Sequence, residues 1–426
     1  MSRFLCIAAA VILLAACQPS KTEESNGGIV TSAVKARIDS SLKAWVDSGK
    51  ISGVSGLIVE KDKEVYFNSF GNADGDIPKP FDRQTIVRIY SMTKPVTGTA
   101  LMQLYEKGMF QLDDPLSKYL PEYADVKVFA GVDKKGKPVL EAPKRPITVR
   151  DITRHTAGFA GGGDTTILGK MVREADVMNK NNTLVQMSQK LATLPLAFHP
   201  GAQWAYGICV DVQAALVEKL SGTPFDQYVK TNILDPLKMN ETRYVPADMN
   251  RFAAMYRREE DGQLNRIPDS LANVFNAQEW PLKPGGFGLT STVDDYMRFA
   301  RMLVNEGTFD GATILKPETV KLMSTNQLAD SVTQRMWLPS KGQVGFGIDF
   351  AVRLRPPVDE KEKAGTVGEF FWDGAASTLF WVDPANELTA VLFVQIFPFS
   401  NDLHKAYRDA IYGVPQSSSP TTATGK

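Results

Sequence analysis

Cysteine and histidine are scarce in this chain of 426 residues, which contains three of each. The histidines are dispersed, and none lies in a metal-binding spacing such as His-x-x-x-His or His-Glu-x-x-His. Cys6 and Cys17 lie in the N-terminal segment, so Cys209 remains alone in the body of the chain, without a partner for a disulfide. Its apolar neighbours Ile208 and Val210 favour a buried structural cysteine over a catalytic thiol. Neither a metal centre nor a disulfide framework is expected.

Net charge and the nucleophile motif of α/β-hydrolases are also missing. Lysine and arginine together number 48, as do aspartate and glutamate, so the chain has no bulk attraction to polyanions and nucleic acid is not an expected partner. No Gly-x-Ser-x-Gly occurs, because the nearest approach, Gly53-Val54-Ser55-Gly56-Leu57, lacks the last glycine. Apolar residues, by contrast, make up 43% of the chain, which is enough for a large core.

An apolar run from Phe4 to Ala16 is too short to span a bilayer and is typical of a secretory signal. It ends in Leu14-Ala15-Ala16-Cys17, which resembles a bacterial lipoprotein signal, in which the cysteine is acylated. We therefore expect residues 1–16 to be a signal peptide and Cys17 to carry lipid. Gln18 follows in place of the aspartate linked to inner-membrane retention, so the resemblance implies an outer-membrane anchor facing the periplasm of a Gram-negative bacterium. An ordinary secretory signal with a chance cysteine is the alternative.

Hydrophobic periodicity predicts strands near both ends of the chain and a mostly helical middle. Strand-like runs occupy residues 53–60, 64–71, 345–352, 367–372, 376–382 and 388–396. Helical patterns occupy residues 31–48, 211–220, 293–306 and 401–412. Because neither strand group is large enough to be stable alone, we expect an α+β fold with one antiparallel sheet built from both chain ends and flanked by the terminal helices.

This organisation predicts one domain over residues 31–412, between a flexible polar tether at 17–30 and a disordered tail at 413–426. Its expected parts are a sheet lobe of about residues 31–80 and 290–412 and a mainly helical middle lobe of about residues 81–289. Clefts between lobes are common ligand sites, so the functional site is expected there.

The pattern Ser-x-x-Lys places a hydroxyl and an amine one helical turn apart, the minimum for an activated serine, and it occurs three times. The copies at residues 32–35 and 40–43 lie largely on the polar face of the first predicted helix, where a solvated surface explains them. The third copy, Ser91-Met92-Thr93-Lys94, opens a helix whose apolar body is buried. Ser91 and Lys94 are therefore the candidate catalytic pair.

Two further motifs follow this serine in order, Tyr206-Gly207-Ile208 and Trp372-Asp373-Gly374. With supporting stretches at residues 152–158, 199–204 and 285–291, the chain resembles the serine β-lactamase and penicillin-binding-protein superfamily. Within it, the resemblance is strongest to class C-like enzymes and family VIII carboxylesterases. It implies a β-lactamase/transpeptidase-like fold and catalysis through an acyl-enzyme, with no cofactor.

The resemblance assigns a role to each motif residue. Ser91 is the nucleophile, and Lys94 and Tyr206 are the general bases and acids that move its proton. The backbone N–H groups of Ser91 and Ala375 form the oxyanion hole. The residues implied to contact substrate are Trp372, Asp373, Gly374 and Ile208, with Gly374 allowing close backbone approach. A plain hairpin turn at Asp373-Gly374 is the alternative interpretation of the third motif.

Two motif positions depart from the pattern of β-lactamases. Trp372 replaces the lysine of Lys-Thr-Gly, which helps to bind the carboxylate of the drug, and Ile208 replaces an asparagine that hydrogen-bonds the acyl amide. Both changes make the pocket more apolar, and a tryptophan in the third motif is similar to family VIII esterases, which favour short acyl esters. Asp373, beside the oxyanion site, is expected to repel anionic substrates or to receive a cationic group.

We therefore expect a serine hydrolase, and specifically a carboxylesterase for short-chain acyl esters with weak or no β-lactamase activity. A β-lactamase or a D-amino-acid peptidase acting on cell-wall peptides uses the same residues, and a catalytically inactive binding protein of the same fold is the third alternative. The expected partner is a small-molecule ester or amide. Membrane contact is expected only through the lipid on Cys17.

Overall fold

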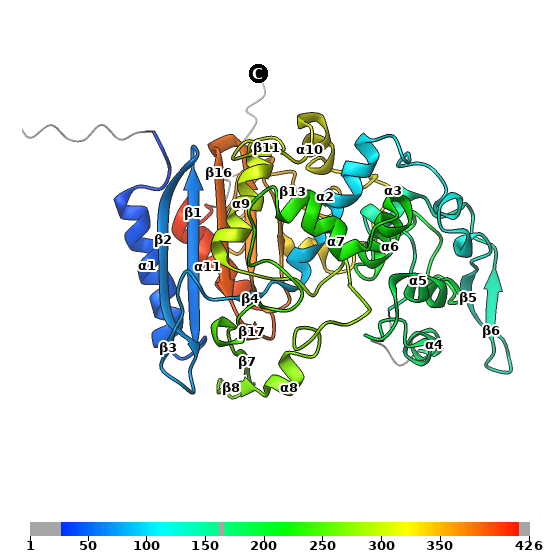
Figure 1. Ribbon diagram of the computed structural model, residues 1–426, viewed down its shortest axis with the longest axis horizontal. Coiled ribbons are helices and arrows are strands. Elements are labelled where there is room, and N and C mark those ends of the chain that lie inside the picture. The colour runs from blue at the N-terminus through cyan, green and yellow to red at the C-terminus, as the bar shows by residue number, and fades with distance from the viewer. Residues whose placement is uncertain (1–26, 162–165, 417–426) are drawn as a thin grey trace, which may run out of the picture.

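The computed structural model describes residues 27–161 and 166–416 of the chain (Figure 1). The predicted signal peptide at 1–16 and the predicted lipidation site, Cys17, lie outside these ranges, as do most of the predicted tether and tail, so these assignments stay predictions. Within the described ranges, no helix is long and apolar enough to cross a membrane.

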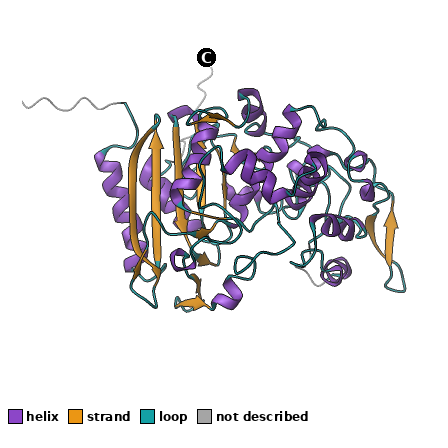
Figure 2. Ribbon diagram, in the orientation of Figure 1, coloured by secondary structure: helices purple, strands orange, loops and turns teal. Residues whose placement is uncertain are grey.

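One eight-stranded sheet takes strands from both ends of the chain, in the order β12-β13-β14-β15-β16-β1-β2-β3 (Figures 1 and 2). The N-terminal strands are β1 (Gly53–Glu60), β2 (Lys63–Asp74) and β3 (Lys79–Pro80). The C-terminal strands are β12 (Val344–Phe346), β13 (Ala351–Arg353), β14 (Phe370–Asp373), β15 (Leu379–Asp383) and β16 (Leu388–Val394). Neighbouring strands are antiparallel, and β1 joins the two groups by pairing with β16. The predicted α+β fold is confirmed.

Helices cover both faces of this sheet. Successive side chains of a strand point to opposite faces. Phe380 of β15 contacts Tyr296 of α9 (Val293–Val304), with ring centroids 5.0 Å apart, whereas the next residue, Trp381, contacts Tyr407 of α11 (Asn401–Tyr412) at 5.5 Å. The first helix, α1 (Ser32–Asp47), packs beside α11. Because both faces are covered, β1 and β16 are buried along their whole length.

Helices joined by long loops are the main regular elements between β3 and α9 (Figure 2), and within this stretch α2 packs against α6. Its helices are η1 (Tyr90–Met92), α2 (Thr93–Glu106), η2 (Leu116–Lys118), η3 (Pro121–Tyr123), α3 (Val149–Thr153), α4 (Ile167–Ala175), α5 (Leu184–Ala192), α6 (Cys209–Ser221), α7 (Phe225–Val229), η4 (Lys230–Leu234), η5 (Met249–Arg251) and α8 (Asp269–Ala272). After α9 come α10 (Pro317–Met323) and the short helix η6 (Leu338–Lys341). The small strand pairs are β4 (Val87–Arg88) with β9 (Thr290–Ser291), β5 (Val128–Val132) with β6 (Pro138–Glu141), β10 (Thr308–Phe309) with β11 (Ala312–Thr313), and β7 (Met255–Arg258) with both β8 (Leu264–Ile267) and β17 (Ile396–Phe397).

Two elements differ from the sequence-based expectation. The single strand expected over residues 345–352 is split into β12 and β13, because Asp349 adopts a left-handed backbone conformation (φ 59°) where the chain reverses. The helix expected to begin at Ser91 begins instead with the 3₁₀ turn Tyr90–Met92, and the α-helix follows from Thr93.

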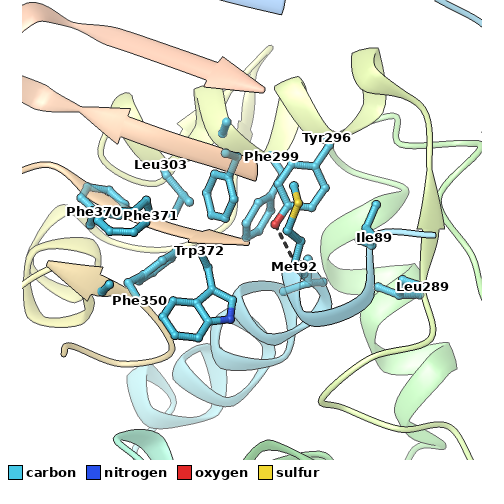
Figure 3. Close-up of a cluster of buried hydrophobic side chains, with 14 of the residues drawn as sticks. Ile89, Met92, Leu289, Tyr296, Phe299, Leu303, Phe350, Phe370, Phe371 and Trp372 are labelled. Atoms are coloured by element: carbon cyan, nitrogen blue, oxygen red, sulfur yellow. Dashed lines mark hydrogen bonds between the residues drawn. The ribbon is translucent and has the colours of Figure 1, made fainter. Parts of the chain in front are cut away.

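A cluster of buried apolar side chains fastens this 3₁₀ turn to the sheet (Figure 3). Ile89 and Met92, on either side of the serine, are fully buried, and the hydroxyl of Tyr296 donates a hydrogen bond of 2.8 Å to the carbonyl oxygen of Met92. Trp372 of β14 belongs to the same cluster. Burying one such side chain stabilises the fold by about 1.5–3 kcal/mol, so the position of the turn is determined by the core.

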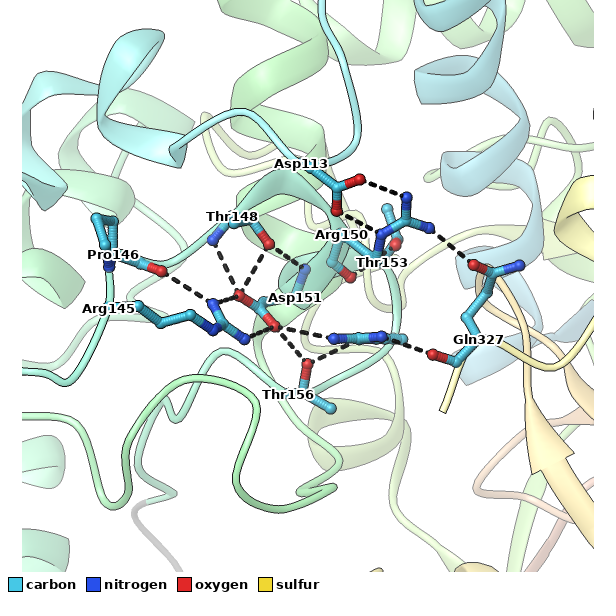
Figure 4. Close-up of polar contacts among 10 residues, drawn as sticks. Asp113, Arg145, Pro146, Thr148, Arg150, Asp151, Thr153, Thr156 and Gln327 are labelled. Atoms are coloured by element: carbon cyan, nitrogen blue, oxygen red, sulfur yellow. Dashed lines mark hydrogen bonds and ion pairs between the residues drawn. The ribbon is translucent and has the colours of Figure 1, made fainter. Parts of the chain in front are cut away.

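A buried carboxylate holds the segment around α3 (Figure 4). Asp151 accepts hydrogen bonds from the Arg145 guanidinium (2.9 Å), the Thr148 N–H (3.0 Å) and the Thr156 hydroxyl (2.7 Å). The Thr148 hydroxyl accepts in return from the N–H of Asp151, which completes a capping box at the start of α3. Burial acts to raise the pKa of Asp151, but the bonds from Arg145 and Thr148 outweigh it and hold the pKa below its usual value.

Asp151→Ala is expected to lower the free energy of unfolding by about 3 kcal/mol at pH 7, because it leaves buried donors without partners. Since the pKa of Asp151 is lower in the folded than in the unfolded chain, its stabilising effect is complete above about pH 4 and is lost as the pH falls through the lowered value. Urea unfolding at a series of pH values from 7 downward measures the difference between the variant and the wild type.

Asp113→Ala is the matched control. Asp113 accepts two hydrogen bonds from Arg150, of 2.7 and 2.8 Å, but its side chain is 74% exposed. An exposed pair contributes about 0–1 kcal/mol. Equal losses of stability in the two variants would contradict the importance given to the buried network.

Candidate active site

Ser91 lies in the 3₁₀ turn that leads into α2, and the backbone just before it is strained. Tyr90 has a φ of 45°, a left-handed conformation that is uncommon for a residue with a side chain. The N–H of Met92 donates to the carbonyl oxygen of Ile89 at 3.0 Å and closes the turn. Backbone strain of this kind gathers at functional sites. The conformation of Tyr90 thus agrees with the assignment of Ser91 made from the Ser-x-x-Lys pattern.

Lys94 lies one helical turn further on and contacts the serine. Its Nζ is 3.2 Å from Ser91 Oγ and 2.6 Å from the carbonyl oxygen of Gly286, and the residue is only 5% exposed. The N–H of Gly286 donates to Asp211 Oδ1 at 3.0 Å. A methyl group at Gly286 would lie 2.9 Å from Asp211 Oδ2 and 3.3 Å from Lys94 Nζ. Glycine is therefore the residue that lets this backbone approach the lysine.

Tyr206 reaches the same lysine from the loop that precedes α6. Lys94 Nζ lies 4.6 Å from the centroid of its ring, and its hydroxyl accepts a hydrogen bond of 3.1 Å from Nε1 of Trp372. The ring also packs on His155 and Trp204, with centroid distances of 4.7 and 6.0 Å. The structure thus brings Ser91, Lys94, Tyr206 and the tryptophan of the third motif together from three separate segments.

The third motif ends beside the serine turn. A Cβ atom at Gly374 would lie 2.2 Å from Thr378 Oγ1 and 2.5 Å from the carbonyl oxygen of Ile89, so glycine here lets the end of β14 approach the backbone that leads into Ser91. Ala375 follows and lines the same pocket as the serine. Ser91 and Ala375 therefore share one cavity, and the role of their N–H groups as oxyanion-hole donors stays a prediction. The need for glycine at 374 comes from packing within the protein, and its contact with substrate stays a prediction.

Asp373 forms a buried ion pair with Lys341 of η6. The side chains are 9% and 5% exposed, respectively. Lys341 Nζ also lies 4.5–5.4 Å from the ring centroids of Trp337, Trp372 and Phe399. A cationic group was one of the partners expected for Asp373, and in the folded chain the protein itself supplies it.

These residues line a pocket of about 460 Å³, a size that suits a small ligand. The residues of the predicted catalytic set that line it are Ser91, Ala375 and Tyr206. Its apolar lining comes from Trp337, Trp372 and Phe399, and its remaining polar lining comes from Ser340, Lys341, Asp373 and Asn401. A reactive serine, aromatic walls and a charged pair therefore share one cavity.

Ile208 lines a second pocket, of about 400 Å³, whose other lining residues include Phe159, Val172 and Leu191. Tyr206 contributes to both pockets. Ile208 is therefore next to the tyrosine but is not among the residues that line the Ser91 pocket, and its predicted contact with substrate is not seen in the geometry.

Three fully buried titratable groups are influenced by the charge of Lys94. Burial first, and this charge second, hold the pKa of His155 well below its usual value, so the imidazole under the Tyr206 ring is neutral at pH 7. Burial raises the pKa of Asp211, while Lys94 acts in the opposite direction. Burial also raises the pKa of Asp349 well above its usual value. Burial is thus the main influence on the titratable groups around the catalytic pair.

Some residues of this site carry no signal in the sequence. Trp337 and Lys341 belong to a stretch without hydrophobic periodicity, and nothing in that stretch points to a pocket. The sequence pattern identifies Asn401 only as the first residue of a predicted helix and gives no sign that it lines the pocket. Asp211 could have been found, because it is an acidic residue in the first turn of the helix that follows Tyr206.

Comparison with known proteins identifies the family of the chain. The sequence profile described as Beta-lactamase matches residues 34–413. The chain belongs to the beta-lactamase family. The superfamily resemblance drawn from the three motifs is thereby confirmed.

Relatives within the beta-lactamase family match nearly the whole chain. Protein Rv1367c of Mycobacterium tuberculosis is 33% identical over 401 residues, which cover 91% of this chain and 95% of the relative. Esterase EstB of Burkholderia gladioli is 26% identical over 407 residues, with coverages of 89% and 95%. Simvastatin synthase (LovD) from Aspergillus terreus shares the fold, with a TM-score of 0.77 at 22% identity, covering 90% of this chain and 98% of its own. The chain thus shares its family with hydrolases and acyltransferases of the serine β-lactamase fold.

Trp372→Phe tests the contact that holds Tyr206. The variant keeps an aromatic ring but removes the Nε1–H donor, and because a neutral hydrogen bond contributes about 1 kcal/mol, kcat/KM for an ester is expected to fall about fivefold. Tyr206→Phe, which removes the hydroxyl itself, is expected to cost about 10² or more. Kinetics are read beside thermal unfolding of each variant. Unchanged kcat/KM in Trp372→Phe, or a loss as large as that in Tyr206→Phe, would contradict this role.

Proposed function

We propose that the protein is a serine hydrolase that cleaves short-chain carboxylic esters through an acyl-enzyme on Ser91. The observation that carries this proposal is the distance of 3.2 Å between Lys94 Nζ and Ser91 Oγ, with the ring of Tyr206 against the same amine. Buried lysines that serve only the fold are normally paired with a carboxylate. Lys94 forms no ion pair with any carboxylate in the described part of the chain, and its neighbours are instead a nucleophile and a phenol.

Acylation follows from these positions. In its unprotonated form, the Lys94 amine accepts the proton of the Ser91 hydroxyl as Oγ attacks the ester carbonyl carbon. The carbonyl oxygen becomes negatively charged, and the N–H groups of Ser91 and Ala375 stabilise it, each such donor contributing about 10²–10³ in rate. The bond to the alcohol oxygen then breaks. Tyr206 gives its proton to the departing alkoxide and takes in exchange the proton held by Lys94.

Deacylation uses the same groups in the opposite direction. A water molecule attacks the carbonyl carbon of the acyl-serine, and its proton passes to the Tyr206 and Lys94 pair. The same two N–H donors stabilise the second oxyanion. When the bond to Ser91 Oγ breaks, Lys94 returns a proton to the serine, so the acid is released and the resting enzyme is restored.

The pocket lining supports esters over β-lactams. Trp372 stands where a β-lactamase presents a lysine, and with Trp337 and Phe399 it gives an apolar lining that suits short acyl and alkyl groups. The cation that the pocket does contain, Lys341, is already paired with Asp373. The asparagine that hydrogen-bonds an acyl amide in β-lactamases is also missing, since Ile208 holds that position.

The direct test is a comparison of substrates. We expect kcat/KM for 4-nitrophenyl butyrate to exceed that for a chromogenic cephalosporin by about 100-fold or more, because the groups that recognise the drug are replaced. Ser91→Ala is expected to reduce ester hydrolysis to the background rate and to abolish labelling by a fluorophosphonate probe.

Each alternative predicts a different result. A preference for the cephalosporin would contradict the esterase proposal in favour of a β-lactamase. Faster release of D-alanine from a cell-wall peptide would favour a peptidase. Failure of the wild-type protein to label at Ser91 would favour a binding protein without catalytic activity.

A further inference from the structure

A methionine in the loop before η6 contacts the backbone of Tyr206. The Tyr206 N–H donates a hydrogen bond of 3.1 Å to Sδ of Met336. Two residues before the tyrosine, the N–H of Trp204 donates to the carbonyl oxygen of Gln334 at 2.8 Å. The residue after the methionine, Trp337, packs on the Tyr206 ring with a centroid distance of 5.0 Å. This loop therefore holds the segment that carries the tyrosine.

Core packing does not account for the place of Met336. The residue is 58% exposed, although its side chain is apolar. Its backbone is left-handed, with a φ of 35°, a conformation that is uncommon for a residue with a side chain and that gathers at functional sites. A thioether sulfur is a weak hydrogen-bond acceptor, and in the described part of the chain the Tyr206 N–H is the donor that this sulfur meets. Contact with the tyrosine, rather than burial, is what this position provides.

Exposure distinguishes Met336 from the other sulfur-containing residues that the structure describes. Two further methionines are exposed, Met249 at 45% and Met109 at 39%, and neither lines the Ser91 pocket. Cys209 is buried, and burial raises the pKa of its thiol, which disfavours the thiolate form that reacts with oxidants. Met336 is thus the most exposed of the described methionines, and its sulfur also contacts the catalytic tyrosine.

We propose that Met336 is a modification site, at which a peroxide oxidises the thioether to the sulfoxide and thereby displaces Tyr206. Sulfur attacks one oxygen of hydrogen peroxide, the O–O bond breaks, and a sulfur–oxygen bond forms. The second oxygen leaves as hydroxide and takes the proton from the oxygen that stays on sulfur, so that the by-product is water. Sulfur loses two electrons, and the peroxide gains them. The inference goes beyond ester hydrolysis and rests on the role proposed for Tyr206.

The sulfoxide does not fit the contact that the thioether makes. Oxidation makes the side chain polar and adds an oxygen to the sulfur atom. Because the Tyr206 nitrogen lies only 3.1 Å from that sulfur, the added oxygen either takes over the N–H or turns the sulfur away from it, and in both cases the tyrosine backbone and the loop move apart. The contacts of Tyr206 with Trp372 and Lys94 depend on that backbone. A misplacement of about 1 Å at a catalytic group can cost about 10² in rate.

Oxidation of the wild-type protein tests this inference without mutation. The full chain is treated with hydrogen peroxide, and samples taken over time are analysed by peptide mass spectrometry and by kinetics with 4-nitrophenyl butyrate. We expect Met336 to be among the first methionines oxidised, and kcat/KM to fall about tenfold or more in step with its oxidation. Treatment with the two methionine sulfoxide reductases, one for each sulfoxide epimer, is expected to restore activity. Unchanged kcat/KM after complete oxidation of Met336 would overturn the proposal.

Two methionine-to-leucine variants identify the responsible residue. Met336→Leu keeps an apolar side chain but has no sulfur. Its kcat/KM is expected to lie about two- to threefold below that of the wild type before treatment, since a weak acceptor is lost, and to resist peroxide. Met249→Leu, which removes an exposed methionine away from the pocket, is the matched control and is expected to lose activity to peroxide as the wild type does. Equal sensitivity of the two variants would contradict a role for Met336.

Labelling of Ser91 by a fluorophosphonate separates this inference from the proposed function. We expect the wild-type protein to label before treatment and about tenfold more slowly after oxidation, while its thermal unfolding temperature stays close to that of the untreated protein. A labelling rate that peroxide leaves unchanged refutes the inference alone, whereas absence of both labelling and ester cleavage in the untreated protein refutes the proposed function. A loss of activity that only follows a falling unfolding temperature would contradict local displacement of Tyr206.

Discussion

The site depends on the burial of one lysine. An amine in a protein interior is costly unless its N–H groups find acceptors, and Lys94 finds them in Ser91 Oγ and the Gly286 carbonyl oxygen. The second contact requires glycine at position 286, since a side chain there would collide with Asp211 and crowd the lysine. It also requires the chain that leads into β9 to pass directly beside α2. Placement of the helical segments around the serine follows from these two contacts.

The sheet supplies the other half of the site. Because β1 pairs with β16, the two ends of the chain form one layer, and β14 within that layer ends beside the serine turn. Trp372 on this strand holds the hydroxyl of Tyr206, while the next residue, Asp373, holds Lys341. One strand end thus connects the groups that perform the reaction with the groups that line the rest of the pocket. Substrate choice and catalysis are therefore coupled through adjacent residues.

Hydrophobic periodicity was sufficient to predict the sheet and the terminal helices, because buried apolar residues follow a regular pattern along strands and along one face of a helix. The order of the motifs along the chain was sufficient to predict that Ser91, Lys94 and Tyr206 lie together. The place of Lys341 in the pocket could not be predicted from the sequence. Its ion pair with Asp373 joins η6 to β14, two elements that are distant along the chain, and no local sequence pattern indicates such a contact. For Ile208, the motif position predicts substrate contact, whereas in the folded chain the residue lines a pocket next to that of Ser91, so this contact stays a prediction.

The most direct test of the account is mass spectrometry of the protein quenched during turnover of 4-nitrophenyl butyrate. The account predicts a single butyryl group, recovered on the peptide that contains Ser91, and its absence in Ser91→Ala. Acylation of another residue, such as Cys209, or ester turnover that persists in Ser91→Ala, would contradict it.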